Sequence, residues 1–180
     1  MAELKETTYV AMDERVRSNR LIAIAIAMSI FVADQASKWV VTYILQLKQR
    51  REFEITPFFN LNWTENRGVS MGFLTAGSET ERWLLVALTA AISIFVAAWL
   101  WREKRRDDAI ALSFVLGGAL GNILDRVRLG YVVDFADLHF GDIHPFLVFN
   151  VADAAITIGV LLLLVRAVLT RDPKPPREEV

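Results

Sequence analysis

The strongest constraint on this chain is the length of its apolar stretches, because four of them are long enough to cross a lipid bilayer. The clearest runs from Trp83 to Trp101 without a charged residue, and a membrane-spanning helix needs about 20 such residues. The other three lie over residues 21–45, 109–127 and 146–165. With 54% apolar residues, a soluble protein with a hydrophobic core is the weaker alternative. The sequence therefore predicts an all-α membrane protein whose four transmembrane helices lie within residues 21–170.

Both ends of the chain are predicted to lie in the cytoplasm. The polar segment 1–20 is not followed by a cleavable signal peptide, because the next apolar run is long and contains Asp34 and Lys38. Twelve of the twenty Lys and Arg residues lie before the first span, after the second or at the end of the fourth. Basic residues favour the cytoplasmic side. Residues 171–180, rich in proline and charge, are predicted to be a disordered cytoplasmic tail.

The connector over residues 46–81 is predicted to form a small extracytoplasmic β-cradle between the first two helices. Apolar and polar residues alternate in two short runs within it, which is typical of strands. Aromatic side chains suit a sheet at the lipid–water interface, and the candidates here are Phe53, Phe58, Phe59 and Trp63. An ordinary loop with aromatic anchors is the alternative. Residues 128–145 are interpreted as a second connector on the same side of the membrane.

Four carboxylates lie in or beside the predicted spans, where burial is costly unless the acids are paired or used. Asp34, Asp125 and Asp153 lie within spans, and Asp134 lies in the second connector. The predicted spans put Asp34 and Asp125 roughly 20 and 24 Å from the cytoplasmic side, and Asp153 roughly 10 Å below the outer surface. All four acids are therefore expected at one level near the outer face.

Two carboxylates in close contact do not both ionise easily, so one keeps a proton while the other acts as a base. Such a pair can activate water and protonate a departing amine, which is aspartyl peptide hydrolysis. Asp153 is the strongest candidate because its helix is apolar, and spacing leaves Asp134 and Asp125 open as its partner. Asp125 adjoins Arg126, which favours an ion-paired role. Asp137 is interpreted, like Asp142, as a solvated loop acid.

Three other functions are compatible with some of these residues. A proton-coupled transporter would use the acids as a relay, but it should distribute polar groups across the bilayer. A serine–lysine peptidase would use Ser37 and Lys38, which point about 100° apart on a helix. A non-catalytic assembly factor would pair its acids for structure only, as Asp34 with Lys38 at helical i, i+4 spacing.

The motifs also resemble those of a known family, the bacterial lipoprotein signal peptidases (signal peptidase II), which are aspartyl proteases of the inner membrane. The matching stretches occur in family order from the first span to the fourth. They are DQASK at 34–38, NRG at 66–68, GGALGNILDR at 117–126, VVDF at 132–135 and FNVAD at 149–153. One departure is Met71, at a position where an aromatic residue is common, which we expect to affect lipid or inhibitor packing alone.

The resemblance implies four transmembrane helices with a periplasmic β-cradle, and a catalytic dyad of Asp134 and Asp153. It implies cleavage of diacylglyceryl-modified prolipoproteins on the N-terminal side of the lipidated cysteine, without a metal or organic cofactor. We expect a monomer in the inner membrane, contacting membrane lipids but no nucleic acid, with its active site near the periplasmic face. The residues at family positions that support or line the site are Asp34, Lys38, Asn66, Gly68, Asn122, Asp125, Arg126, Asn150 and Ala152.

Overall fold

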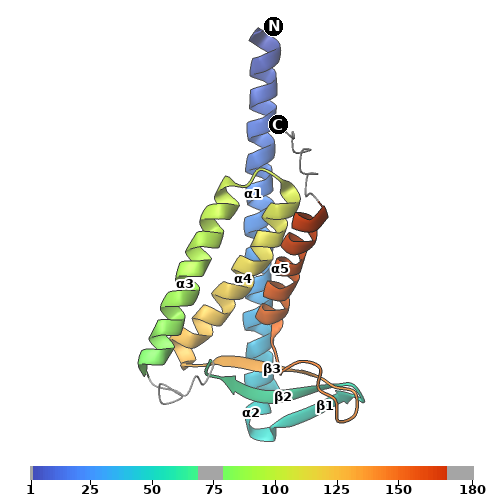
Figure 1. The fold of residues 1–180 in the computed structure, drawn as a ribbon. Helices are drawn as coiled ribbons and strands as arrows, with labels where there is room; N and C mark the ends of the chain where they lie inside the picture. The colour runs from blue at the N-terminus through green and yellow to red at the C-terminus, as the bar shows by residue number, and fades with distance from the viewer. Residues whose placement is uncertain (1, 69–78, 170–180) are drawn as a thin grey trace, which may run out of the picture.

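Four long helices and a small sheet make up the fold of the computed structural model (Figure 1). The structure describes residues 2–68 and 79–169, with side chains from residue 14 onward, so Met71 and the tail 171–180 lie outside the described residues. The long helices are α1 (Ala2–Trp39), α3 (Glu79–Arg102), α4 (Arg106–Leu129) and α5 (Val151–Leu169). All four are long and apolar enough to cross a membrane, the first over Glu14–Ile44. The predicted fold class is confirmed.

The start of α1 and the end of α5 lie at one end of the bundle, and the sheet lies at the other (Figure 1). Helix α1 begins at Ala2, so the polar segment 1–20 continues into the first span without a break. At the sheet end α1 passes into five residues of π-helix, η1 (Val40–Ile44), and then into the short helix α2 (Leu47–Arg50). The polypeptide therefore reaches the sheet directly from the first span.

Helix α4 is the centre of the bundle and packs against the other three long helices. Glycines on α4 allow this approach: a Cβ on Gly117 would lie 2.5 Å from the carbonyl oxygen of Ala27, and one on Gly118 would meet the carbonyl oxygen of Ala152. Small residues at helix interfaces are the usual means of close packing in membranes. The helices that carry the predicted site residues are thus held in backbone contact.

The sheet has three antiparallel strands in the order β1 (Glu52–Thr56), β2 (Phe59–Asn66) and β3 (Val132–Leu138). The first two confirm the strands predicted in the 46–81 connector. Strand β3 shows that the 128–145 segment is more than a connector, because it completes the sheet. Its residues from Val132 to Asp137 are all buried, so the apolar–polar alternation that marks a half-exposed strand is absent.

Two side chains of the sheet differ from their predicted environment. Trp63 is only 6% exposed and belongs to a core formed with β3 and η1, whereas Phe53 and Phe58 are exposed as predicted for an interfacial sheet. Asp137 is not a solvated loop acid. It lies on β3, is 4% exposed, and its Oδ1 is 3.0 Å from Nδ1 of His144. The side chains of Trp63 and Asp137 are both buried because β3 lies between β2 and the segment that precedes α5.

The fourth long helix begins at Val151, five residues later than the start predicted from Pro145. The backbone N–H of Phe149 donates to the carbonyl oxygen of Ala136, so the residues just before α5 pair with β3 instead of forming a helical turn. This late start moves Asp153 into the first turn of α5. It lies about 3–5 Å along the helix axis from its start, instead of the greater depth that the sequence predicted.

Candidate active site

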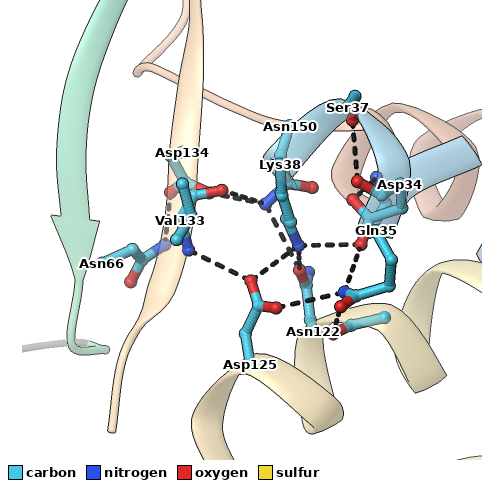
Figure 2. A network of polar contacts seen from close by, with 12 residues as sticks. Asp34, Gln35, Ser37, Lys38, Asn66, Asn122, Asp125, Val133, Asp134 and Asn150 are labelled. Carbon is cyan, nitrogen blue, oxygen red and sulfur yellow. Dashed lines mark hydrogen bonds and ion pairs between the residues drawn. The ribbon is translucent and has the colours of Figure 1, made fainter. Parts of the chain in front are cut away.

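Four carboxylates from four different elements meet in one hydrogen-bonded network where the bundle joins the sheet. Figure 2 shows three of them, Asp34, Asp125 and Asp134. Asp34 comes from α1, Asp125 from α4, Asp134 from β3 and Asp153 from α5. Their convergence on one level agrees with the sequence-based expectation. The network has two halves, one around Lys38 and one around Asn150, which are joined by the side chain of Asn122.

Lys38 is the cation at the centre of the first half. It is 4% exposed, and its Nζ lies 2.9 Å from Oδ2 of Asp34 and 2.9 Å from Oδ2 of Asp125. A third hydrogen bond, 3.1 Å long, goes to Oδ1 of Asn122. An ammonium group has three donors, so all of them are used. Asp125 is thus ion-paired, as its sequence context suggested, but with Lys38 across the helix interface.

The two acids around Lys38 have further donors that fix them in place. Oδ1 of Asp34 accepts a 3.0 Å hydrogen bond from the backbone N–H of Ala152, and Oδ2 of Asp125 accepts one of 3.2 Å from the backbone N–H of Val133. Nε2 of Gln35 donates to both carboxylates at 3.1 Å. Buried charges persist when they are paired and hydrogen-bonded in this way. The hydrogen bonds and ion pairs of this half therefore hold α1, α4, α5 and β3 together.

Asn150 connects the two remaining acids. Its side chain accepts a 2.9 Å hydrogen bond from the backbone N–H of Asp153, and its own backbone N–H donates to Oδ2 of Asp153 at 3.3 Å. This reciprocal pattern is a helix-capping box, which explains why α5 begins at Val151. The Nδ2 of Asn150 also donates to Oδ1 of Asp134 over 2.6 Å. One side chain thus sets the relative positions of both carboxylates.

Asp134 is held between two amides. Its other carboxylate oxygen, Oδ2, accepts a 2.9 Å hydrogen bond from Nδ2 of Asn66 on the neighbouring strand. Asp134 faces Thr64 in the β2–β3 register, and Asn66 lies two residues further along β2, so it is a diagonal neighbour on the same face. The side chain of Asn66 is itself fixed, because its Oδ1 accepts from the backbone N–H of Gly68, where a φ of 98° suits glycine.

Burial raises the pKa of Asp134 to about 6, and the nearby Asp153 carboxylate adds to the effect, while hydrogen bonds from Asn66 and Asn150 oppose it. Asp134 is only 2% exposed. In the described residues no Lys or Arg lies within ion-pair distance of Asp134 or Asp153. Asp153 instead accepts a 2.8 Å hydrogen bond from Nδ2 of Asn122. This half of the network therefore contains two acids held by neutral donors.

Arg126 lies at the edge of the network, where its charge interacts with Asp153, Asp134 and Asp125. Its buried Nε has no hydrogen-bond partner among the described residues. The backbone of the same residue is held firmly, since its carbonyl oxygen accepts a 2.8 Å hydrogen bond from Nε of Arg82 on α3. A guanidinium group in this position is available to a bound molecule.

The structure brings together every residue that the sequence predicted for the site. Ala152 contributes the backbone N–H that donates to Asp34, and Gly121 leaves room for the same carboxylate, since a Cβ on Gly121 would meet Oδ2 of Asp34. Sequence reasoning did not assign roles to Gln35 or to the backbone N–H of Val133. The first stands inside the DQASK stretch, which could have pointed to it. A backbone donor leaves no signal in the residue types.

The geometry argues against two of the alternative functions. Oγ of Ser37 donates to the carbonyl oxygen of Asp34 at 2.7 Å, and all three Lys38 donors are used elsewhere, so no serine–lysine dyad forms. The buried acids of the described spans all belong to one network at the sheet end, whereas a proton relay would need groups along the bilayer. No cluster of three metal-ligating side chains occurs within residues 14–68 and 79–169.

An apolar groove opens beside Asp153. It has a volume of about 320 Å³ and continues along α5 past Ala154, Thr157 and Ile158. The groove's other wall is formed by residues that precede α5, with Phe146 and Leu147 at 61% and 91% exposure. The candidate dyad is therefore reached from a surface suited to lipid or to an apolar peptide.

The chain is similar to known proteins in both sequence and fold. Residues 26–169 match the model of a family described as signal peptidase (SPase) II. The chain is 59% identical to a lipoprotein signal peptidase of Rhizorhabdus wittichii over 90% of this chain and 94% of that protein. It is 40% identical to one of Methylocella silvestris, over 82% and 85% of the two chains. A bacterial membrane enzyme solved at 2.3 Å resolution superimposes with a TM-score of 0.71, at 30% identity and over 88% and 94% of the two chains.

Proposed function

Since the chain belongs to the signal peptidase II family, and is thus an aspartic protease of lipoprotein processing in a bacterial membrane, we propose that Asp134 and Asp153 are its catalytic dyad. The observation that carries this proposal is the contrast within the network. Asp34 and Asp125 share the Lys38 cation, whereas Asp134 and Asp153 are bound by amides alone and are linked through Asn150. The second pair is therefore the one that we propose to transfer a proton.

We assign the resting proton to Asp134 and the negative charge to Asp153. The pKa of Asp134 is raised to about 6 by burial. Asp153 lies in the first turn of α5 and accepts hydrogen bonds from Nδ2 of Asn122 and the backbone N–H of Asn150. Helix N-termini and such donors stabilise an anion. The ionised carboxylate then serves as the general base, and the protonated one as the general acid.

In the proposed reaction a water molecule attacks the scissile carbonyl carbon while Asp153 takes its proton. The proton of Asp134 passes to the carbonyl oxygen, which gives a neutral tetrahedral diol. Asp153 next gives its proton to the amide nitrogen, and Asp134 takes one back from a hydroxyl group as the C–N bond breaks. The products are a carboxylic acid and an amine, and both acids return to their starting states. Arg126 is placed to bind a substrate carbonyl near the dyad.

The proposed substrate is a diacylglyceryl-modified prolipoprotein, cut on the N-terminal side of its lipidated cysteine. A signal peptide spans the membrane as an apolar segment, so its scissile bond would reach the level where the bundle joins the sheet. The groove beside Asp153, with exposed Phe146 and Leu147, offers an apolar surface to such a substrate. We propose that the sheet and the segment before α5 enclose the lipidated cysteine and limit access of water.

We further propose that both termini face the cytoplasm and the dyad lies near the periplasmic face of the inner membrane. The start of α1 and the end of α5 lie at the end of the bundle opposite the sheet (Figure 1), and most of the basic residues are near them. We also propose that the active unit is a monomer.

The direct test is cleavage of a diacylglyceryl-modified precursor and its lipid-free counterpart by the purified protein, with the product masses measured. We expect a single cut before the lipidated cysteine, and little cleavage of the lipid-free precursor. Equal cleavage of both precursors would contradict the lipid-enclosing role, and a different cut position would contradict the proposed specificity.

A further inference from the structure

A second cavity, separate from the dyad, lies between the sheet ends of α1 and α4. It has a volume of about 250 Å³, and neither Asp134 nor Asp153 lines it. It touches the polar network through Gln35, Lys38, Asp125 and Val133. The rest of its lining is mainly aromatic and includes Thr42, Leu129 and two further cations, Lys48 and Arg128. The proposed peptidase reaction gives this cavity no task.

The charges that face the cavity favour an anion. Lys38 lies 2.9 Å from Asp125 and 2.9 Å from Asp34, which does not line the cavity, so Lys38 is already paired and is not the cation that would receive a ligand. Lys48 is held in place by Glu65 at 2.9 Å and by the rings of Trp63 and Tyr131. Arg128 is exposed and has no hydrogen-bond or ion-pair partner within residues 14–68 and 79–169. One cation is thus fixed and the other is unpaired at the same cavity.

The cavity also adjoins a surface that faces the lipid. Trp39, Tyr43 and Leu129 line it, and they are 54%, 64% and 46% exposed at the ends of the first and third spans. Tryptophan and tyrosine at the end of a span are typical of the membrane interface. Cations beside such a surface attract acidic lipids. A ligand that suits both features carries a phosphate and acyl chains.

We propose that this cavity binds the headgroup of an acidic phospholipid, with its phosphate between Lys48 and Arg128 and its acyl chains along Trp39, Tyr43 and Leu129. The bound lipid joins α1, the end of α4 and the sheet, and so braces the elements that hold Lys38 and Asp125. The proposal concerns binding and does not depend on the assignment of the dyad.

The test is a lipid titration of the delipidated full-length protein in neutral detergent. Binding is monitored by thermal unfolding and by tryptophan fluorescence emission, to which Trp39 and Trp63 contribute. The probes are phosphatidylglycerol, phosphatidylcholine and inorganic phosphate. We expect phosphatidylglycerol alone to raise the melting temperature and shift the emission. The variant R128Q should weaken its apparent affinity about fivefold, the usual effect of one cation at a charged membrane surface, and R128K should restore most of it.

A matched control is R50Q, because Arg50 is also exposed on the sheet side but does not line the cavity. It should bind phosphatidylglycerol as the wild type does. Equal binding by R128Q and the wild type would overturn the proposal. An equal response to phosphatidylcholine would show that charge does not select the lipid, and an equal response to inorganic phosphate would show that the acyl chains play no part; either result also overturns it. K48Q gives a second variant should R128Q unfold.

Discussion

The site contains two pairs of carboxylates that differ in what holds them. Asp34 and Asp125 share the ammonium group of Lys38, at 2.9 Å from each, and both oxygens of each carboxylate accept hydrogen bonds or ion pairs. Asp134 and Asp153 contact only amide and backbone donors, chiefly those of Asn150, Asn122 and Asn66. A shared cation stabilises negative charge on the first pair, whereas the second pair has neutral donors only, and two carboxylates close together do not both ionise easily. We therefore call Asp34 and Asp125 the structural pair, and Asp134 and Asp153 the chemical pair, although all four belong to the same network.

The largest effect on stability is expected at the structural pair. The variant Lys38→Met leaves two buried carboxylates without their cation, and breaking a buried ion pair costs about 3–5 kcal/mol. Thermal unfolding in detergent should therefore show a large drop in melting temperature. The matched control is Lys48→Met, which removes a half-exposed pair with Glu65 and should cost at most about 1 kcal/mol. Similar losses in both variants would contradict the structural role of Lys38.

The next effect concerns the side chain that connects the chemical pair. Asn150→Ala removes the donor to Asp134 and the cap of Asp153, and each buried group left unsatisfied costs about 1–3 kcal/mol. We expect turnover to fall by about 10- to 100-fold, with a moderate loss of stability. Asn60→Ala is the comparison, because Asn60 is also a buried amide, bonded to Glu52 away from the acids. It should lose stability but keep turnover, and a fall in turnover equal to that of Asn150→Ala would argue against a positioning role.

The pH dependence of kcat/KM tests the proton assigned to Asp134. Activity should fall about tenfold per pH unit above an apparent pKa near 6, because the general acid is then deprotonated. The hydrogen bond from Asn66 favours the charged form and holds this pKa down, so Asn66→Ala should move the descending limb to higher pH. A limb that stays in place, or moves to lower pH, would contradict the assignment.

The smallest effect is expected where a carboxylate is paired at the surface. Lys48 and Arg67 hold the pKa of Glu65 at about 2, below its usual value of 4.5. The lowered pKa adds stability that is fully present above about pH 4.5 and is lost as the pH falls toward 2. Glu65→Gln should remove this dependence, a change of at most about 1 kcal/mol, visible as a smaller difference in melting temperature between pH 5 and pH 3. A larger change would mean that this surface pair is as important as the buried one.

Much of the fold could be predicted because helices in lipid are marked by length and composition. The four spans and the β1–β2 pair were correctly predicted, and so was the gathering of Asp34, Asp125, Asp134 and Asp153 at one level. Strand β3 was missed because burial on both faces removes the alternation that marks a strand. Asp137 was misassigned for the same reason, since a polar residue in a connector gives no sign that it faces the sheet.

The start of α5 and the pairing of the acids depended on contacts that residue types do not encode. Pro145 suggested an early start, but the pairing of Phe149 with Ala136 delays the helix until the Asn150 cap. The neighbour of Asp125 in sequence is Arg126, yet its partner in space is Lys38 on another helix. Spacing alone left the partner of Asp153 open, and the family resemblance named Asp134. Asp125 is paired with Lys38, whereas Asp134 has no cationic partner among the described residues, and this contrast is the basis of the proposed dyad.

The central claim is that the two pairs have different tasks, and one measurement compares them directly. Purified wild type, Asp134→Asn, Asp153→Asn and Asp125→Asn would be tested for cleavage of a diacylglyceryl-modified precursor, with the melting temperature of each recorded. We predict that the first two variants fold normally and lose at least about 10³-fold in rate, whereas Asp125→Asn loses stability and its folded fraction still cleaves. A stable, inactive Asp125→Asn variant beside an active Asp134→Asn variant would contradict the account.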